Sequence, residues 1–97
     1  MADWRFPVTG DVDLSNCGEL QDKLLVVVNT TNDDLLLDCT DLQFIDSTGV
    51  GVFMHTRQLL EIQGRGFRVE NLNGMARRAI DVLGLTDLLE IPASESA

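Results

Sequence analysis

Residues 35–63 read LLLDCTDLQFIDSTGVGVFMHTRQLLEIQ, and this stretch decides the fold class. Its first five residues, 35–39, are almost wholly apolar, which is typical of a buried parallel strand. Residues 40–46 predict a loop, and a helix is expected from about residue 47 to residue 63, ended by Gly64. This helix carries two adjacent stripes of mostly apolar residues. The first stripe comprises Val52, His55, Leu59 and Ile62, and the second comprises Phe53, Thr56 and Leu60. A helix with so much apolar surface is expected to pack on a sheet.

The residues before this unit predict a strand and a helix. Residues 4–9 alternate as a short strand does, and Pro7 places that strand at a sheet edge. Residues 10–13 predict a turn. Ser15 or Asn16 can then cap a helix, and Asn16-x-x-Glu19 has the form of a capping box. The expected buried face of this helix carries Cys17, Leu20, Leu24 and Val27, and the polar run 30–34 ends it.

The residues after the unit continue the alternation of strand and helix. Residues 67–70 predict a strand, and Asn71 or Asn73 can cap a helix over about 74–83. The side chains expected to be buried on this helix are Met75, Ala79, Val82 and Leu83. Residues 88–91 predict a last short strand. The order predicts a layered α/β fold: a single, mostly parallel or mixed four-stranded sheet with about three helices.

Length and charge restrict the function. A chain of 97 residues forms a single domain, 1–97, with an expected ordered core at about 4–91 and a flexible polar tail at 92–97. The net charge is −9, and residues 1–46 contribute −8 of it. This balance excludes a basic nucleic-acid-binding surface and favours a cationic partner surface, unless the charge serves solubility alone. The longest apolar runs are far shorter than a membrane span, and the start of the chain lacks the pattern of a signal peptide, so a cytoplasmic protein is expected.

Cofactor and metal sites are not expected. Cys17, Cys39 and His55 are too few to hold a structural zinc ion, and two cysteines make no disulfide framework. Both cysteines are expected to be small buried fillers. A redox-controlled variant stays open: if the two thiols came close, a disulfide could control binding.

Enzyme motifs are also missing. Gly49-Val50-Gly51 lacks the third glycine of a dinucleotide fingerprint, and the chain has no Gly-Lys-Ser/Thr of a P-loop. Ser47 lacks the leading glycine of a nucleophile elbow. His55 lies two turns further along the same helix, about 12 Å away by helical rise. These absences predict that the protein is not an enzyme, and they disfavour the alternative of a small esterase that uses Ser47.

The junction at residues 46–51 nevertheless carries unusual chemistry. An acid and two hydroxyls, Asp46, Ser47 and Thr48, stand where the loop becomes a helix, and a hydroxyl there can cap exposed amides. Gly49 and Gly51 follow, although each glycine costs up to about 1 kcal/mol in a helix relative to alanine. Close approach of another backbone, from the neighbouring strand or from a partner protein, would explain them.

This junction resembles the phosphoacceptor motif of STAS domains, specifically of the bacterial anti-sigma factor antagonists. The motif D-L-x-F-[IM]-D-S-[ST]-G-[LV]-G-V matches residues 41–52 throughout. Residues 8–14 resemble the family's segment G-[ED]-[LVI]-D at a strand end, and residues 73–85 resemble its late helix ending in Gly-Leu. The three matches stand in order over roughly residues 6–91.

The resemblance implies a switch. Ser47 would be phosphorylated by the cognate anti-sigma factor, a serine kinase of the histidine-kinase-like ATPase type. The unphosphorylated domain would bind that kinase and release the sigma factor, and a serine phosphatase would restore the binding form. The partner-binding residues implied are Asp13, Asp46, Ser47, Thr48, Gly49 and Val50. Phe53 is favoured as a core residue over an interface residue, and Arg77 and Arg78 are expected on a solvated face.

Two points stay open at this stage. The same fold serves as the STAS subunit of a membrane lipid transporter that docks on its ATPase, which is the alternative function. The chain also differs from free-standing members at both ends, where it lacks an extra first strand and a longer last helix. A trimmed sheet of this kind could expose an edge and promote a homodimer, or the chain could be a fragment of a larger protein.

Overall fold

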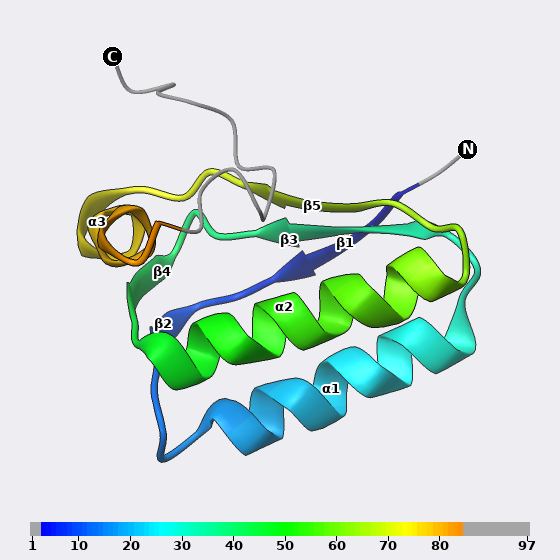
Figure 1. The fold of residues 1–97 in the computed structure, drawn as a ribbon, viewed down its shortest axis with the longest axis horizontal. Helices are drawn as coiled ribbons and strands as arrows, with labels where there is room; N and C mark the ends of the chain where they lie inside the picture. The colour runs from blue at the N-terminus through cyan, green and yellow to red at the C-terminus, as the bar shows by residue number, and fades with distance from the viewer. Residues whose placement is uncertain (1–2, 85–97) are drawn as a thin grey trace.

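A computed structural model describes residues 3–84 (Figure 1). The elements in chain order are β1 (Asp3–Pro7), β2 (Gly10–Val12), α1 (Cys17–Thr30), β3 (Asp34–Asp38), β4 (Leu42–Ile45), α2 (Ser47–Ile62), β5 (Phe67–Glu70) and α3 (Gly74–Val82). The α/β class, the three helices and the parallel strands at 35–39 and 67–70 are therefore confirmed. The strand expected at 88–91 lies outside the described residues.

The strands form a bent arrangement of two parallel sheets. One has the order β1-β3-β5 and the other the order β2-β4. Strand β1 is an edge strand, as Pro7 predicted. Backbone hydrogen bonds continue between the two sheets. The Val8 amide donates to the Asp38 carbonyl over 2.9 Å, and the Gly10 amide donates to the Asp41 carbonyl over 2.9 Å.

Two predictions in this region were wrong. Residues 10–13 were expected to turn and residues 40–46 to form a loop, but β2 and β4 form there instead. Each strand is only three or four residues long, and each follows directly on a longer strand. Gly10 does bend the chain, with a φ of +72°, which explains why the sequence there is typical of a turn. The residues after Gly10 are nevertheless extended, because β2 pairs with the distant strand β4.

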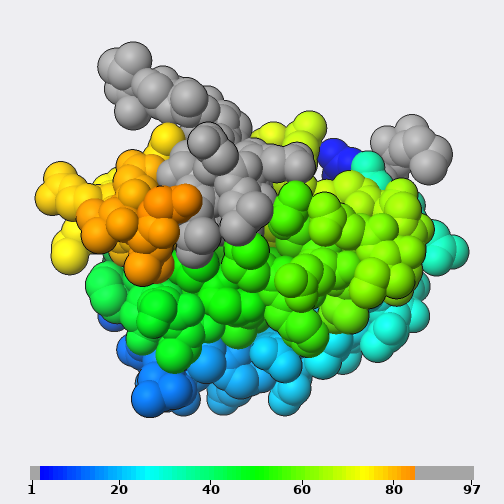
Figure 2. All heavy atoms as spheres, viewed as in Figure 1, coloured from blue at the N-terminus to red at the C-terminus, as the bar shows by residue number. Residues whose placement is uncertain are grey.

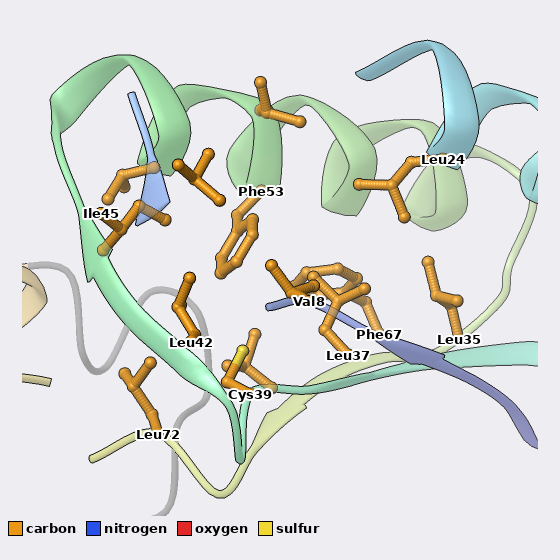
Figure 3. Packing of buried hydrophobic residues seen from close by; sticks show 14 of the residues in the cluster. Val8, Leu24, Leu35, Leu37, Cys39, Leu42, Ile45, Phe53, Phe67 and Leu72 are labelled. Atoms are coloured by element: carbon orange, nitrogen blue, oxygen red, sulfur yellow. The ribbon is translucent and has the colours of Figure 1, made fainter. Parts of the chain in front are cut away.

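Helices α1 and α2 lie side by side on one face of the three-stranded sheet (Figure 1). Their buried side chains meet those of Leu35, Leu37 and Val69 to form one hydrophobic core. Phe53 points from α2 into the middle of this core and is fully buried, as expected (Figure 3). Helix α3 packs on β4, away from α1 and α2.

The predicted helix faces needed correction. On α2 the buried stripe comprises Gly49, Val50, Val52, Phe53, Thr56 and Leu60. His55 is exposed and Ile62 is 82% exposed, so the predicted stripe that contained them faces the core only in part, through Val52. On α3 the buried residues are Ala76 and Ile80, whereas Met75 and Val82 are exposed. Each helix carries two adjacent stripes of similar hydrophobicity, so the sequence alone does not determine which one is buried. The orientation in which the helix packs on the sheet determines it.

The predicted side-chain caps were also partly wrong. Asn16 and Asn73 occupy the N-cap positions of α1 and α3, but neither side chain bonds to the helix amides. The Asn16 amide group instead donates to the Asp11 carbonyl over 2.8 Å, and its oxygen accepts from the Asp13 amide over 2.9 Å. Asn16 therefore holds the β2–α1 turn together, and no capping box with Glu19 forms.

Candidate functional site

The site lies where β2 and β4 end and α2 begins. Asp46 is the N-cap of α2, and one of its carboxylate oxygens accepts hydrogen bonds from the Thr48 amide, the Gly49 amide and the Thr48 hydroxyl over 3.0, 3.0 and 2.5 Å. The Asp46 amide donates to the Val12 carbonyl over 3.1 Å, which ties this turn to the end of β2. The cap is thus supplied by Asp46, whereas the sequence had suggested Ser47 or Thr48.

Hydrogen bonding keeps Asp46 ionised. Hydrogen bonds lower the pKa of the Asp46 carboxyl below its ordinary value, and the bond from the Thr48 hydroxyl contributes most, followed by the bond from the Gly49 amide. The amides of Thr48 and Leu14 lower the pKa further, whereas desolvation raises it by a smaller amount. A carboxylate at this position also interacts favourably with the positive end of the helix dipole. The first turn of α2 therefore presents a fixed negative charge.

Asp13 occupies the neighbouring turn. Its carboxylate accepts from the Ser15 amide over 2.9 Å and from the Ser15 hydroxyl over 2.6 Å. Leu14, between them, is 75% exposed. Because the Asp46 amide is bonded to the carbonyl of Val12, the residue before Asp13, the fold brings the two acid-bearing turns together.

Ser47 is the first residue of α2 and is exposed. Among the hydrogen bonds formed within residues 3–84, none involves its hydroxyl. This hydroxyl is therefore free to meet a partner or to accept a phosphoryl group, while the hydroxyl of Thr48 is already committed to Asp46. Ser47 also borders an apolar groove that contains Phe44 and Val82.

The next two residues support the site from beneath. A β-carbon added at Gly49 would lie 2.7 Å from side-chain carbons of Ile45 and Val12, and 3.1 Å from the Val12 carbonyl oxygen. The neighbouring strands, not a partner, therefore explain this glycine. Val50 is 2% exposed and packs in the core, so its role in the site is to anchor the helix.

Gly51 differs from Gly49. It is exposed, and an added β-carbon would have no atom within 4 Å. Close approach within the described chain does not explain Gly51.

Metal ligands, cysteines and membrane-spanning helices were also considered among the described residues. Among residues 3–84, no group of three or more His, Cys, Asp and Glu side chains is arranged to hold a metal ion. Both cysteines are free thiols, and burial with the charge of Asp38 raises the pKa of the Cys39 thiol to about 12. Within the same range of residues, no helix has the length and apolar character needed to cross a bilayer.

The comparisons with known proteins agree with this geometry. A family model described as "Mlab, STAS domain" matches residues 3–90. The chain belongs to the STAS domain family. This STAS domain is 32% identical over 91 residues to the anti-sigma-B factor antagonist of Bacillus subtilis (strain 168), covering 94% of the chain and 83% of that relative. It is 25% identical over 88 residues to the anti-sigma-B factor antagonist of Staphylococcus epidermidis, covering 91% and 82%.

Two solved structures share the fold. The anti-sigma factor antagonist SpoIIAA in its unphosphorylated form superimposes with a TM-score of 0.74 at 18% identity, over 94% of this chain and 80% of that chain. A sulfate transporter family protein from Wolinella succinogenes superimposes with a TM-score of 0.73 at 16% identity, over 90% and 70%. Because two proteins with such different names fit equally well, the likeness to solved structures establishes the fold of this STAS domain and not its function.

Sequence reasoning missed three features of the site. The bridging role of Asn16 was hidden because the same residue type also caps helices. The exposure of Leu14 depends on the path of the turn after β2. The apolar groove beside Ser47 joins residues from β4 and α3, about thirty positions apart, and no local pattern reports such a junction.

Proposed function

We propose that this chain is an anti-sigma factor antagonist in which Ser47 is the phosphorylated residue of a binding switch. The unphosphorylated form binds an anti-sigma factor serine kinase and releases a sigma factor. Phosphorylation ends that binding, and a serine phosphatase restores it. The observation that carries the proposal is the exposed Ser47 hydroxyl on the first turn of α2, which forms no hydrogen bond within residues 3–84, in a chain whose curated relatives are named anti-sigma-B factor antagonists.

The geometry supports both states of such a switch. A phosphate at Ser47 would stand at a helix N-terminus, where the positive end of the helix dipole favours an anion, so the domain would stay folded. The phosphate would add about −1.5 to −2 charge beside the ionised Asp46. A partner surface that fits the unmodified serine would then meet added charge and a larger group.

The proposed contact surface consists of the exposed and half-buried residues of the two turns. Asp13, Asp46, Ser47 and Thr48 present polar groups to a partner. Gly49 and Val50 are buried and set the position of that surface. The acidic side chains suit a partner with complementary basic groups.

Binding assays with four baits test the proposal. Unmodified protein, Ser47→Ala, Ser47→Asp and the control Gln58→Asp would be used to capture partners from an extract of the source cells, with identification by mass spectrometry. Gln58 is exposed on the same helix, so its variant adds the same charge away from the site. We expect one kinase-like ATPase to bind all baits except Ser47→Asp, whose affinity should fall on the order of 5–150-fold.

Incubation of the captured kinase and ATP with the purified protein then tests the modification itself. The phosphopeptide should map to Ser47 and be absent from Ser47→Ala. If every bait retains the same ATPase and no phosphate appears, the proposal is wrong. Constitutive docking of that kind would favour the alternative function, a STAS subunit of a membrane lipid transporter.

A further inference from the structure

The apolar groove beside Ser47 carries a single kind of charge. It lies between β4 and α3 and has a volume of about 440 Å³. The β4–α2 junction contributes Phe44 and Ser47, and α3 contributes Met75, Arg78 and Val82. Figure 2 shows the last turn of α3, in orange, above the first turn of α2, in green. Among the described residues that line the groove, Arg78 is the charged one, so a serine hydroxyl and a guanidinium group border the same apolar space.

Arg78 differs from its neighbour Arg77 in its bonding. The Arg77 Nε donates to the carboxylate oxygens of Asp81 over 3.3 and 3.4 Å. Arg78 is exposed, and among residues 3–84 it forms no hydrogen bond or ion pair. A guanidinium group presents two parallel N–H donors, which match two oxygens of a phosphate. Arg78 is therefore available to an anion at the groove, whereas Arg77 is already paired.

A phosphate on Ser47 would find few hydrogen-bond donors in its own helix. Three consecutive amides of the first turn, those of residues 48–50, each donate to an oxygen of Asp46 over 3.0 Å. The Asp46 carboxylate itself is ionised and would repel the phosphate. The three phosphate oxygens are strong acceptors and therefore need a donor from another element. The unpaired arginine of α3 is a cationic donor on the same groove.

We propose that Arg78 is the phosphate-binding residue of the modified protein, in which its guanidinium group pairs with the phosphate on Ser47 across the groove. The proposal rests on the proposed function, because it takes Ser47 as the modified residue. The ligand is a phosphate monoester with a charge of about −1.5 to −2. Such a pair would join α3 to the first turn of α2. Phosphorylation would thus change the shape of the surface beside Ser47 as well as its charge.

Phosphorus NMR of the full chain tests the pair. Phosphoserine is incorporated at position 47 during translation, and the titration is carried out at about 0.15 M salt, where distant charges are largely screened. The second pKa of the phosphate should rise by about 0.5 pH unit in Arg78→Gln, because a nearby guanidinium group favours the dianion. The matched control Arg77→Gln removes the same charge from the adjacent residue and should change the pKa far less. Equal shifts in the two variants, or no shift in Arg78→Gln, would overturn the proposal.

Urea unfolding separates pairing from a structural role of Arg78. At pH 7.5, Arg78→Gln should lower the urea midpoint of the protein that carries phosphoserine at position 47. The same substitution should leave the midpoint of the unmodified protein unchanged, because the exposed arginine has no partner within residues 3–84. Arg77→Gln should have one and the same effect in both forms. An equal effect of Arg78→Gln in both forms would contradict the proposal.

The two proposals fail separately. The phosphoserine is installed during translation, so neither readout needs a kinase, a phosphatase or a binding partner. Absence of the pair would leave the binding switch at Ser47 intact. Absence of a captured kinase would leave the titration and the unfolding results unchanged.

Discussion

At the scale of single residues, Gly49 and Gly51 are two neighbouring glycines of α2, but the fold requires a glycine at only one of these positions. Both occupy the first two turns of α2, and the sequence suggested one explanation for both. The strands behind α2 leave no room for a β-carbon at Gly49, whereas Gly51 faces open space. Only Gly49 is therefore required by the fold of the described chain.

Alanine substitutions at these two glycines should change stability in opposite directions. Gly49→Ala would overpack the contact with Ile45 and Val12 and should lower the free energy of unfolding by about 1–3 kcal/mol. Gly51→Ala should raise it by up to about 1 kcal/mol, because alanine favours the helix. Urea denaturation of both variants measures the difference. A loss of stability in Gly51→Ala equal to that in Gly49→Ala would show that the packing argument is wrong.

The two cysteines should differ in reactivity. Cys39 is buried, and its thiol has a pKa raised to about 12, whereas Cys17 is half-buried. Since the thiolate is the reactive form, a disulfide reagent at pH 8 should titrate Cys17 in the native protein and both thiols in guanidinium. Cys17→Ser, as control, should show no rapidly reacting native thiol. Rapid modification of Cys39 in that variant would contradict the assignment.

At the scale of elements, Arg65 joins two connections. Its guanidinium group donates to the Asp33 carbonyl over 2.8 and 3.0 Å and to the Val28 carbonyl over 2.9 Å. The loop between α2 and β5 is thereby held on the end of α1 and the start of β3. The sequence offered no sign of this role, because the acceptors are backbone atoms more than thirty residues away.

Removal of this arginine should therefore cost more than removal of a surface arginine. Arg65→Ala leaves partly buried carbonyls without donors and should lower the free energy of unfolding by about 1.5–3 kcal/mol. Arg68→Ala breaks only an exposed ion pair with Glu70 and should cost less than about 1 kcal/mol. Thermal and urea unfolding measure both. Equal costs would mean that Arg65 does not hold the loops together.

At the scale of the whole molecule, the many acids of the first half are not all solvent-facing charges. Asp38 is the last residue of the central strand β3 and accepts hydrogen bonds from the Asn71 side chain over 3.0 Å and the Thr40 hydroxyl over 2.6 Å. These bonds, with a smaller contribution from Arg5, hold the pKa of the Asp38 carboxyl far below its ordinary value. Asp38, at the end of β3, is thus linked to β1 through Arg5 and to the segment after β5 through Asn71.

The stabilising effect of Asp38 should disappear in acid. Because folding lowers this pKa, the contribution is complete above the unfolded value near about 4 and decreases as the pH falls below it. Asp38→Asn should therefore be less stable than the unmodified protein at pH 7, and the two urea midpoints should converge toward pH 3. Asp22→Asn, on the exposed side of α1, is the control for the loss of one surface carboxylate. A difference that stays constant for Asp38→Asn would contradict this account.

The sequence by itself determined the alternation of strands and helices, the buried central strand and the family. These follow from local quantities: apolar runs, helix stops such as Gly64, and a phosphoacceptor motif that matches over residues 41–52. The motif also predicted Ser47 and Asp46 as the centre of the candidate site, because a loop-to-helix junction is formed by adjacent residues.

Only the tertiary structure decided which surfaces are buried and what touches the site. The short strands β2 and β4 exist because distant segments pair. The docking of α2 and α3 chose one of two apolar stripes on each helix, and it placed Val50 in the core while Ser47 stayed exposed. These outcomes depend on contacts between residues far apart in the chain, and the free energy of such contacts appears only when the whole fold brings the residues together.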